Sequence, residues 1–320
     1  MNNYTWLQQK LHQFALSSQF MRETAFELEH SNIEIQKKSD KNIFVAGLAR
    51  SGTTILLNAI FKSDLFASLT YKDMPFVLAP NLWSHVYPEK NNSTLIERAH
   101  KDGIKISTAS PEAFEEVFWK TFDDSNKDSI IKFKTYIQSI KKKYNKNRYL
   151  SKNNQNIKRL ELISSIFPSS VILVPFRNPL QHANSLLNQH KKFLEYSSND
   201  KFISKYMSWI GHEEFGPNYK PFFTENLYYS CDLEINHWLE QWHRAYQKLF
   251  VLATKSSNIH LVSYEKLCDS ISYWHQILDI LDISEHYHFS FNESLKVVNE
   301  EIDSCLVDKS MSLYQQLNSY

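Results

Sequence analysis

The sequence has few of the features that mark several common classes of protein. Its 320 residues include only three cysteines, with no C-x-x-C pair, so neither a disulfide framework nor a zinc site is expected. Lysine and arginine total 36 against 35 aspartate and glutamate. This balance argues against nucleic-acid binding and against a polybasic membrane anchor. No apolar run approaches the ~18 residues that cross a bilayer.

The N-terminus also lacks a targeting pattern. The opening residues, MNNYTWLQQKLHQFALSSQF, contain no basic segment followed by a long apolar run, and therefore do not form a signal peptide. Sparse cysteines and the absence of an apolar run predict a protein of the reducing cytoplasm. A composition rich in lysine, asparagine and isoleucine, with only five glycines, indicates a bacterial source.

Short apolar strands alternate along the chain with helical patterns. Strands are expected at 43–47, 148–152, 170–176 and 258–264, and helices at 53–61, 130–145, 156–166, 179–194, 232–254 and 265–282. This order predicts an α/β fold, a P-loop-like three-layer sandwich with a central parallel sheet flanked by helices. Ligands of such sheets bind at the carboxyl ends of the strands.

We expect residues 1–320 to form a single domain. A helical lead-in precedes the first strand over residues 1–40, and a polar tail closes the chain over 283–320. The segments 70–130 and 195–231 are rich in loop-forming residues, and we expect both to be insertions over the site rather than linkers.

The stretch GLARSGTT, residues 47–54, has the outline of a phosphate-binding loop. Gly47 and Gly52 are five positions apart, an apolar strand leads in, and a helical pattern follows. The usual loop reads G-x-x-x-x-G-K-[ST], but Thr53 stands where the triphosphate-binding lysine is expected, and the only cation is Arg50. Backbone N–H groups of such a loop bind an anion. A single phosphate bearing one further group therefore fits better than a triphosphate, unless the stretch is an ordinary strand–turn–helix joint.

The second strong strand also ends in a cation. Arg177 leaves the strand, Asn178 and Pro179 suit the N-cap and first position of the next helix, and Ser185 lies about two turns into it. Arg177 and Ser185 converge on one anion if the loop folds back; otherwise Arg177 caps a helix and Ser185 is a surface residue. One ligand with both a 5′- and a 3′-phosphate would satisfy both strand ends.

Together the two patterns resemble the sulfotransferase superfamily that uses 3′-phosphoadenosine 5′-phosphosulfate (PAPS). The resemblance covers about residues 40–282 and includes the segments YLSKNNQNIKRLELISSIFPSSVILVPFRNP and LVSYEKL. It is closer to the carbohydrate and tyrosylprotein branches, which carry arginine in the loop, and to bacterial relatives. It implies that Arg177 and Ser185 hold the 3′-phosphate, and that the 5′-phosphosulfate lies against Arg50, Ser51, Gly52, Thr53 and Thr54.

The resemblance further implies in-line transfer of a sulfuryl group from PAPS to an acceptor hydroxyl with a carboxylate base. A carbohydrate or glycoconjugate is the acceptor expected first. Arg50 is the expected cation at the leaving phosphate. Lys152 either adds charge in the acceptor cleft or is an exposed residue at the end of a strand. No metal is needed, and no ligand cluster with metal spacing appears.

Two residues are candidates for the base. Asp73, in TYKDMPF, is the nearest match to the glutamate that the arginine-loop branches carry after the loop's helix; otherwise it caps the helix that begins at Pro75. His85 is the alternative, because the ordinary pKa of histidine suits proton transfer. Weaker candidates are His182, His190 and His212.

The aromatic segment EEFGPNYKPFF, with Trp209, either lines the acceptor cleft or packs as a surface loop. Two other functions also stay open. A P-loop-type kinase would need the missing lysine and a magnesium-binding aspartate after an apolar strand. A non-catalytic nucleotide-binding relative would keep both anion sites and lack a working base.

Overall fold

The structure is a computed structural model that describes residues 4–31, 41–87, 96–97, 105–293, 295–298 and 300–320. A five-stranded sheet with the order β2-β5-β1-β6-β7 forms its centre, and every neighbouring pair in it is parallel. The strands are β1 (Ile43–Val45), β2 (Phe66–Ala67), β5 (Arg148–Lys152), β6 (Val171–Phe176) and β7 (Ile259–Ser263). The predicted α/β class is therefore confirmed. The short edge strand β2 was not predicted, because two residues give no periodicity.

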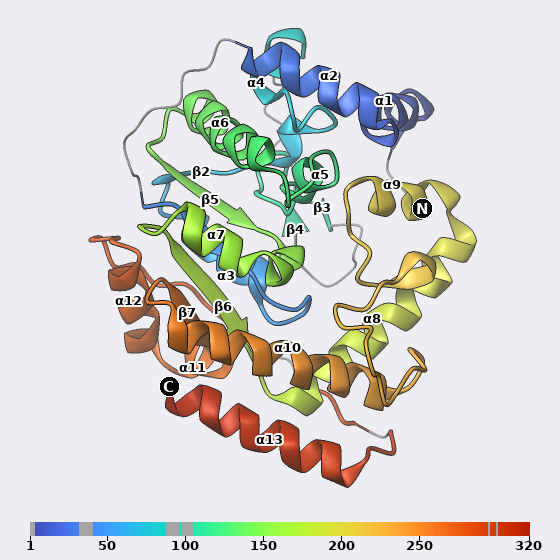
Figure 1. The fold of residues 1–320 in the computed structure, drawn as a ribbon, viewed down its shortest axis with the longest axis vertical. Helices are drawn as coiled ribbons and strands as arrows, with labels where there is room; N and C mark the ends of the chain where they lie inside the picture. Colours follow the sequence, from blue (N-terminus) through green and yellow to red (C-terminus); the bar gives the residue numbers. More distant parts are fainter. Residues whose placement is uncertain (1–3, 32–40, 88–95, 98–104, 294, 299) are drawn as a thin grey trace.

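Helices cover both faces of this sheet (Figure 1). One face packs against α6 (Lys127–Tyr144), α7 (Leu160–Ile166) and α10 (Ile235–Lys255), and the other packs against α3 (Thr53–Phe61), α11 (Tyr264–Asp269) and α12 (Ile271–Ile280). Within β1, Phe44 belongs to the first core, whereas Ile43 and Val45 belong to the second. Because both faces are buried, the strands are continuous apolar runs in the sequence.

The remaining elements extend from these three layers. Near the N-terminus and around α6 lie α1 (Trp6–Ser17), α2 (Gln19–His30), α4 (Pro80–Val86) and α5 (Glu116–Trp119). An antiparallel pair joins β3 (Ile96–Glu97) to β4 (Lys105–Ile106). The described residues also form the short 3₁₀ helices η1 (Tyr71–Asp73), η2 (Asn154–Lys158) and η3 (Gly216–Asn218).

The expected loop-rich segment 195–231 begins instead with helix. Helix α8 (Pro179–Asn199) runs past its expected end, and α9 (Lys201–Trp209) follows at once. Asp200 separates the two, because its carboxylate accepts hydrogen bonds from the backbone N–H groups of Phe202 and Ile203. The Ser-Ser-Asn run before it has weak helix propensity, and the tertiary packing of α8 overrides that preference.

The expected polar tail, 283–320, ends in a helix as well. Helix α13 (Ser304–Ser319) is capped by the Asp303 carboxylate, which accepts a hydrogen bond from the backbone N–H of Leu306. Its buried residues Leu313 and Leu317 join the core that contains α10. The helix packs along α10 and also contacts the edge strand β7 (Figure 1).

The N-terminal lead-in consists, where it is described, of α1 and α2, which separate at Ser18. Parts of this lead-in and of the expected insertion 70–130 lie outside the described residues. Among the helices that the structure does describe, none combines the length and the apolar character needed to span a bilayer.

Candidate active site

The carboxyl ends of four neighbouring strands bring the predicted anion-binding residues to one edge of the sheet. The loop with Arg50 follows β1, Lys152 ends β5, Arg177 follows β6, and Tyr264 follows β7. The sheet register places Val45 of β1 directly beside Lys152 of β5. This is the edge at which open parallel sheets bind their ligands.

Gly52 is required in this loop for two reasons. Its φ angle is +99°, in the left-handed region that favours glycine. A Cβ atom at this position would also lie 2.4 and 2.7 Å from two ring carbons of Tyr264. The tyrosine after β7 therefore packs directly against the turn that opens α3.

The N-terminus of α3 offers hydrogen-bond donors to an anion. Gly52 is its N-cap and has no side chain that could cap the first turn. The N–H groups of a first helical turn have no partner inside the helix, and they favour negative charge. Thr53 and Thr54 lie in this turn with 3% and 7% of their surface exposed. Ser51 comes just before this turn. Its side chain is buried, and its backbone N–H already donates a hydrogen bond to the Leu48 carbonyl.

Two of the residues expected at different phosphates lie side by side. The Arg50 Nε donates a hydrogen bond to the Ser185 hydroxyl over 3.3 Å, although Ser185 is 135 positions further along the chain. Arg177 is 8% exposed, and its guanidinium carbon lies 5.9 Å from the centre of the Tyr264 ring. Its buried Nε has no hydrogen-bond partner in the described structure. The loop after β1 and helix α8, which are expected to hold the two phosphates, therefore lie next to each other.

His182, on the same helix as Ser185, also holds this loop. Its Nε2–H donates to the Ala49 carbonyl over 2.8 Å. Complete burial lowers the pKa of His182 to about 3, so the ring is neutral at physiological pH. The residue predicted as a weak candidate base is therefore a structural link between α8 and the loop.

Asp73 lies in a closed polar cluster away from this edge, which argues against its predicted role as the base. It is 0% exposed and pairs through Oδ1 with the Lys143 ammonium over 2.6 Å. Its Oδ2 accepts hydrogen bonds from the Thr70 backbone N–H and from the Tyr144 hydroxyl. Lys143 and Tyr144 end α6 and precede β5, so they lie toward the amino end of the strand. Each carboxylate oxygen of Asp73 is thus already occupied.

The structure does not bring His85 to the strand ends either. It is an exposed residue of α4, and its Nδ1–H donates to the Asn81 carbonyl one turn earlier. The weaker candidates anchor a loop instead: His190 Nδ1 accepts from the Gly216 N–H, and His212 Nε2 donates to the Ala113 carbonyl. Burial lowers the pKa of both rings.

The aromatic residues expected to line an acceptor cleft pack mainly against other aromatic rings. Trp209 contacts Phe202 edge-on, and Phe215 lies between Phe193 and Trp238. Their packing fixes the loop after α9. Glu214, directly before Phe215, instead accepts a hydrogen bond from Asn154.

Lys152 is a buried cation of the site rather than an exposed residue at the end of a strand. Its side chain is 4% exposed, and its ammonium lies 3.9 Å from Oε1 of Glu112. The Ala113 N–H and the Tyr71 hydroxyl donate to the two oxygens of Glu112. No sequence pattern marks Glu112, which lies in the irregular segment after η1.

A chain of side-chain hydrogen bonds runs from the loop to Glu214. The Thr53 hydroxyl donates to Asn154 Oδ1 over 3.3 Å, and Asn154 Nδ2 donates to Glu214 Oε1 over 3.3 Å. Both Asn154 and Glu214 are buried, with 8% and 7% of their surface exposed. The described residues contain no group of acidic, histidine or cysteine side chains that could hold a metal ion.

A parallel sheet, a phosphate loop without the triphosphate lysine, and two arginines at adjacent strand ends agree with the sequence comparison. The profile described as the Sulfotransferase family matches residues 42–286, well over half of the chain. The chain therefore belongs to the sulfotransferase family and is an enzyme of that class. No curated protein matches its sequence.

Similar solved structures include three sulfotransferases. Sulfotransferase STF1 from Mycobacterium tuberculosis H37Rv is 13% identical, with a TM-score of 0.47, covering 97% of this chain and 81% of that chain. Sulfotransferase STF9 from Mycobacterium avium is 11% identical, with a TM-score of 0.47, covering 99% and 79%. The sulfotransferase domain from the curacin biosynthetic pathway is 15% identical, with a TM-score of 0.41, covering 87% and 97%.

Replacing Gly52 with alanine tests the contact with Tyr264. We expect Gly52→Ala to lower the free energy of unfolding by about 2–5 kcal/mol, because left-handed strain and overpacking add. The control is Gly216→Ala, which shares a positive φ of +79° but whose Cβ would lie 3.3 Å from its nearest neighbour. Urea unfolding of both variants measures the difference. Equal losses would show that the Tyr264 contact adds nothing.

Replacing Asp73 with asparagine separates a structural role from a catalytic one. We expect Asp73→Asn to reduce stability by about 3–5 kcal/mol, because it leaves the Lys143 ammonium buried without its partner. The transfer rate per folded molecule should stay within about threefold, since no step uses this carboxylate. Urea unfolding and kcat, measured well below the melting temperature, report the two effects. A large fall in kcat with unchanged stability would instead identify Asp73 as the catalytic base.

Proposed function

We propose that this sulfotransferase transfers a sulfuryl group from PAPS to an acceptor hydroxyl. The observation that carries the proposal is the contact between Arg50 and Ser185, which joins a loop suited to a 5′-phosphosulfate to a helix suited to a 3′-phosphate. A nucleotide with phosphate groups at both positions would complete the two sides together. Thr53, in place of a lysine, disfavours a nucleoside triphosphate.

The cations at this edge suit the charge that develops during transfer. Negative charge builds up on the oxygen that bridges the sulfuryl group and the 5′-phosphate as that bond breaks. Arg50 and the first turn of α3 would stabilise it on one side, and Lys152 would do so on the other. Preorganised donors in a buried site stabilise such charge more strongly than water does.

We propose a carbohydrate or glycoconjugate as the acceptor. The support is the polar character of the residues beside the loop, since Lys152, Asn154 and Glu214 are all buried and all able to form hydrogen bonds. A molecule with several hydroxyl groups can donate to and accept from such side chains, whereas an apolar acceptor cannot.

Calorimetric titration with 3′-phosphoadenosine 5′-phosphate, the product nucleotide, tests the donor assignment. We expect the bisphosphate to bind more tightly than AMP or ATP. Arg177→Ala should weaken bisphosphate binding by about 10- to 150-fold, because hydrogen bonds to charged groups contribute about 1.5–3 kcal/mol. AMP binding should change little, since AMP has no 3′-phosphate.

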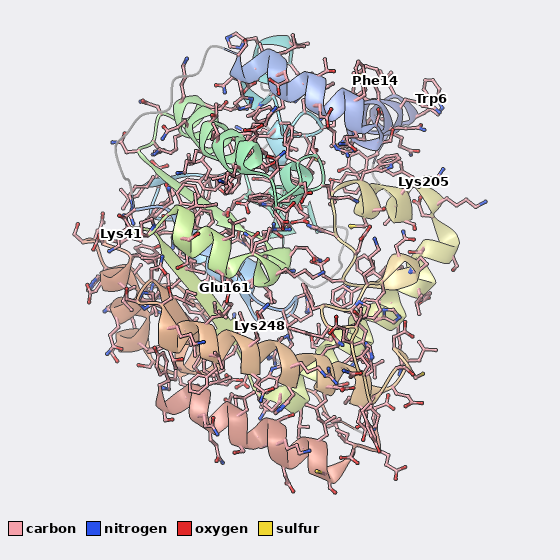
Figure 2. All side chains as sticks on the ribbon, viewed as in Figure 1. Trp6, Phe14, Lys41, Glu161, Lys205 and Lys248 are labelled. Atoms are coloured by element: carbon pink, nitrogen blue, oxygen red, sulfur yellow. The ribbon has the colours of Figure 1, made fainter. Side chains whose placement is uncertain are left out.

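The control variant is Lys248→Ala, which removes an exposed cation of α10 that Figure 2 labels. It should leave the affinities for all three nucleotides unchanged. Tighter binding of ATP than of the bisphosphate would contradict the proposal and favour a kinase. An equal loss of AMP affinity in Arg177→Ala would contradict the placement of the 3′-phosphate.

A further inference from the structure

Sulfuryl transfer to a hydroxyl needs a group that takes the hydroxyl proton, and neither Asp73 nor His85 lies at the anion-binding edge. This requirement rests on the proposed function. A carboxylate that takes the proton must lie near the loop after β1, because the acceptor oxygen must approach the sulfuryl group held there.

Glu214 lies close to that position. Its Oε1 accepts a hydrogen bond from Asn154 Nδ2, and Asn154 Oδ1 accepts one from the Thr53 hydroxyl. Two hydrogen bonds therefore separate this carboxylate from the first residue of α3. The Asn154 amide can make both contacts in one orientation only, with its nitrogen donating to Glu214 and its oxygen accepting from Thr53. It therefore holds the Glu214 and Thr53 side chains in place.

The backbone on both sides of Glu214 is anchored. His212 donates to the Ala113 carbonyl before it, and the Gly216 N–H donates to His190 after it. The Lys220 N–H closes the loop by donating to the Glu213 carbonyl over 2.9 Å. A carboxylate held by packing and by neighbouring hydrogen bonds has the fixed geometry that proton transfer requires.

Three neighbouring carboxylates are already engaged by hydrogen bonds or by cations, and a fourth, Glu265, accepts the Asn178 N–H and lies beside Arg177, on the side of the expected 3′-phosphate. Glu112 takes hydrogen bonds on both oxygens and lies beside Lys152. Glu116 pairs with Arg159 and Asn153. Glu213 pairs with Lys220 over 2.7 Å and with Lys120 over 3.6 Å. The described hydrogen bonds of Glu214 engage Oε1 alone, so its Oε2 can face the hydroxyl group of the acceptor substrate.

We propose that Glu214 is the catalytic base and that Asn154 positions it. As the acceptor oxygen forms its bond to sulfur, its proton passes to Oε2 of Glu214. The bond between sulfur and the bridging oxygen breaks, and its electron pair stays on the 5′-phosphate of the departing nucleotide. Arg50 and Lys152 stabilise that charge. Glu214 then releases its proton to water after the product leaves.

The test compares Glu214→Gln with Glu213→Gln, a neutralised carboxylate one position away. The reaction is the turnover of PAPS, with water as the acceptor and then with methyl glucoside as a hydroxyl probe. We expect Glu214→Gln to lower kcat by about 10²- to 10⁴-fold, the usual contribution of a positioned base. Its affinity for 3′-phosphoadenosine 5′-phosphate should stay within about threefold of the wild type, and Glu213→Gln should keep both values, since only Oε2 of Glu214 takes the proton.

A second measurement distinguishes a base from a structural residue. Formate, a small carboxylate, should raise the kcat of Glu214→Ala by about tenfold or more, because it can occupy the vacated space and take the proton. A structural role predicts no rescue. Unchanged kcat in Glu214→Gln, or a loss of kcat without rescue and with weakened nucleotide binding, would overturn the assignment.

A different result would show that the proposed function itself is wrong. A wild-type protein that neither binds 3′-phosphoadenosine 5′-phosphate nor turns over PAPS above the uncatalysed rate would overturn the donor and, with it, the base. Binding of the bisphosphate by all variants with equal turnover would overturn the role of Glu214 alone.

Discussion

The attachment of α8 to the loop after β1 is the interaction on which the rest of the site depends. A neutral, buried His182 donates to the Ala49 carbonyl, and Ser185, one turn later, accepts a hydrogen bond from Arg50. Because β1 and β6 are adjacent parallel strands, the helix that follows β6 begins beside the loop that follows β1. The two contacts fix that proximity, and with it the spacing between the two expected phosphate positions.

Buried charge is concentrated at this edge, and it is only partly compensated by the protein. Lys152 has Glu112 nearby, whereas Arg177 stacks on Tyr264 and keeps a buried Nε without a partner in the described structure. Burial raises the pKa of Glu265, which accepts the Asn178 N–H beside Arg177. Leaving such groups unpaired is costly, so a doubly anionic ligand would stabilise the folded protein as well as bind to it.

Local patterns in the sequence predicted the parallel sheet and the positions of the glycine loop and of Arg177 at strand ends, because a strand, a glycine turn and a helix start lie within one short segment. Asp73 and His85 were predicted as the base by residue type and distance along the chain, and the structure places neither of them at the strand ends. Their surroundings depend on α6 and α4, which no local pattern specifies. Glu112 and Glu214 reach the site from irregular segments, and only tertiary packing places them beside Lys152 and Asn154. Helix α13 was missed for a related reason, because its apolar residues are sparse and its burial depends on α10.

We propose that one nucleotide joins the loop after β1 to α8 through two separate phosphates. The most direct measurement is a crystal structure of the protein with bound 3′-phosphoadenosine 5′-phosphate. We expect the 5′-phosphate at the first turn of α3 and the 3′-phosphate within hydrogen-bonding distance of Arg177 and Ser185. A nucleotide bound elsewhere, or one whose 3′-phosphate faces solvent, would contradict it.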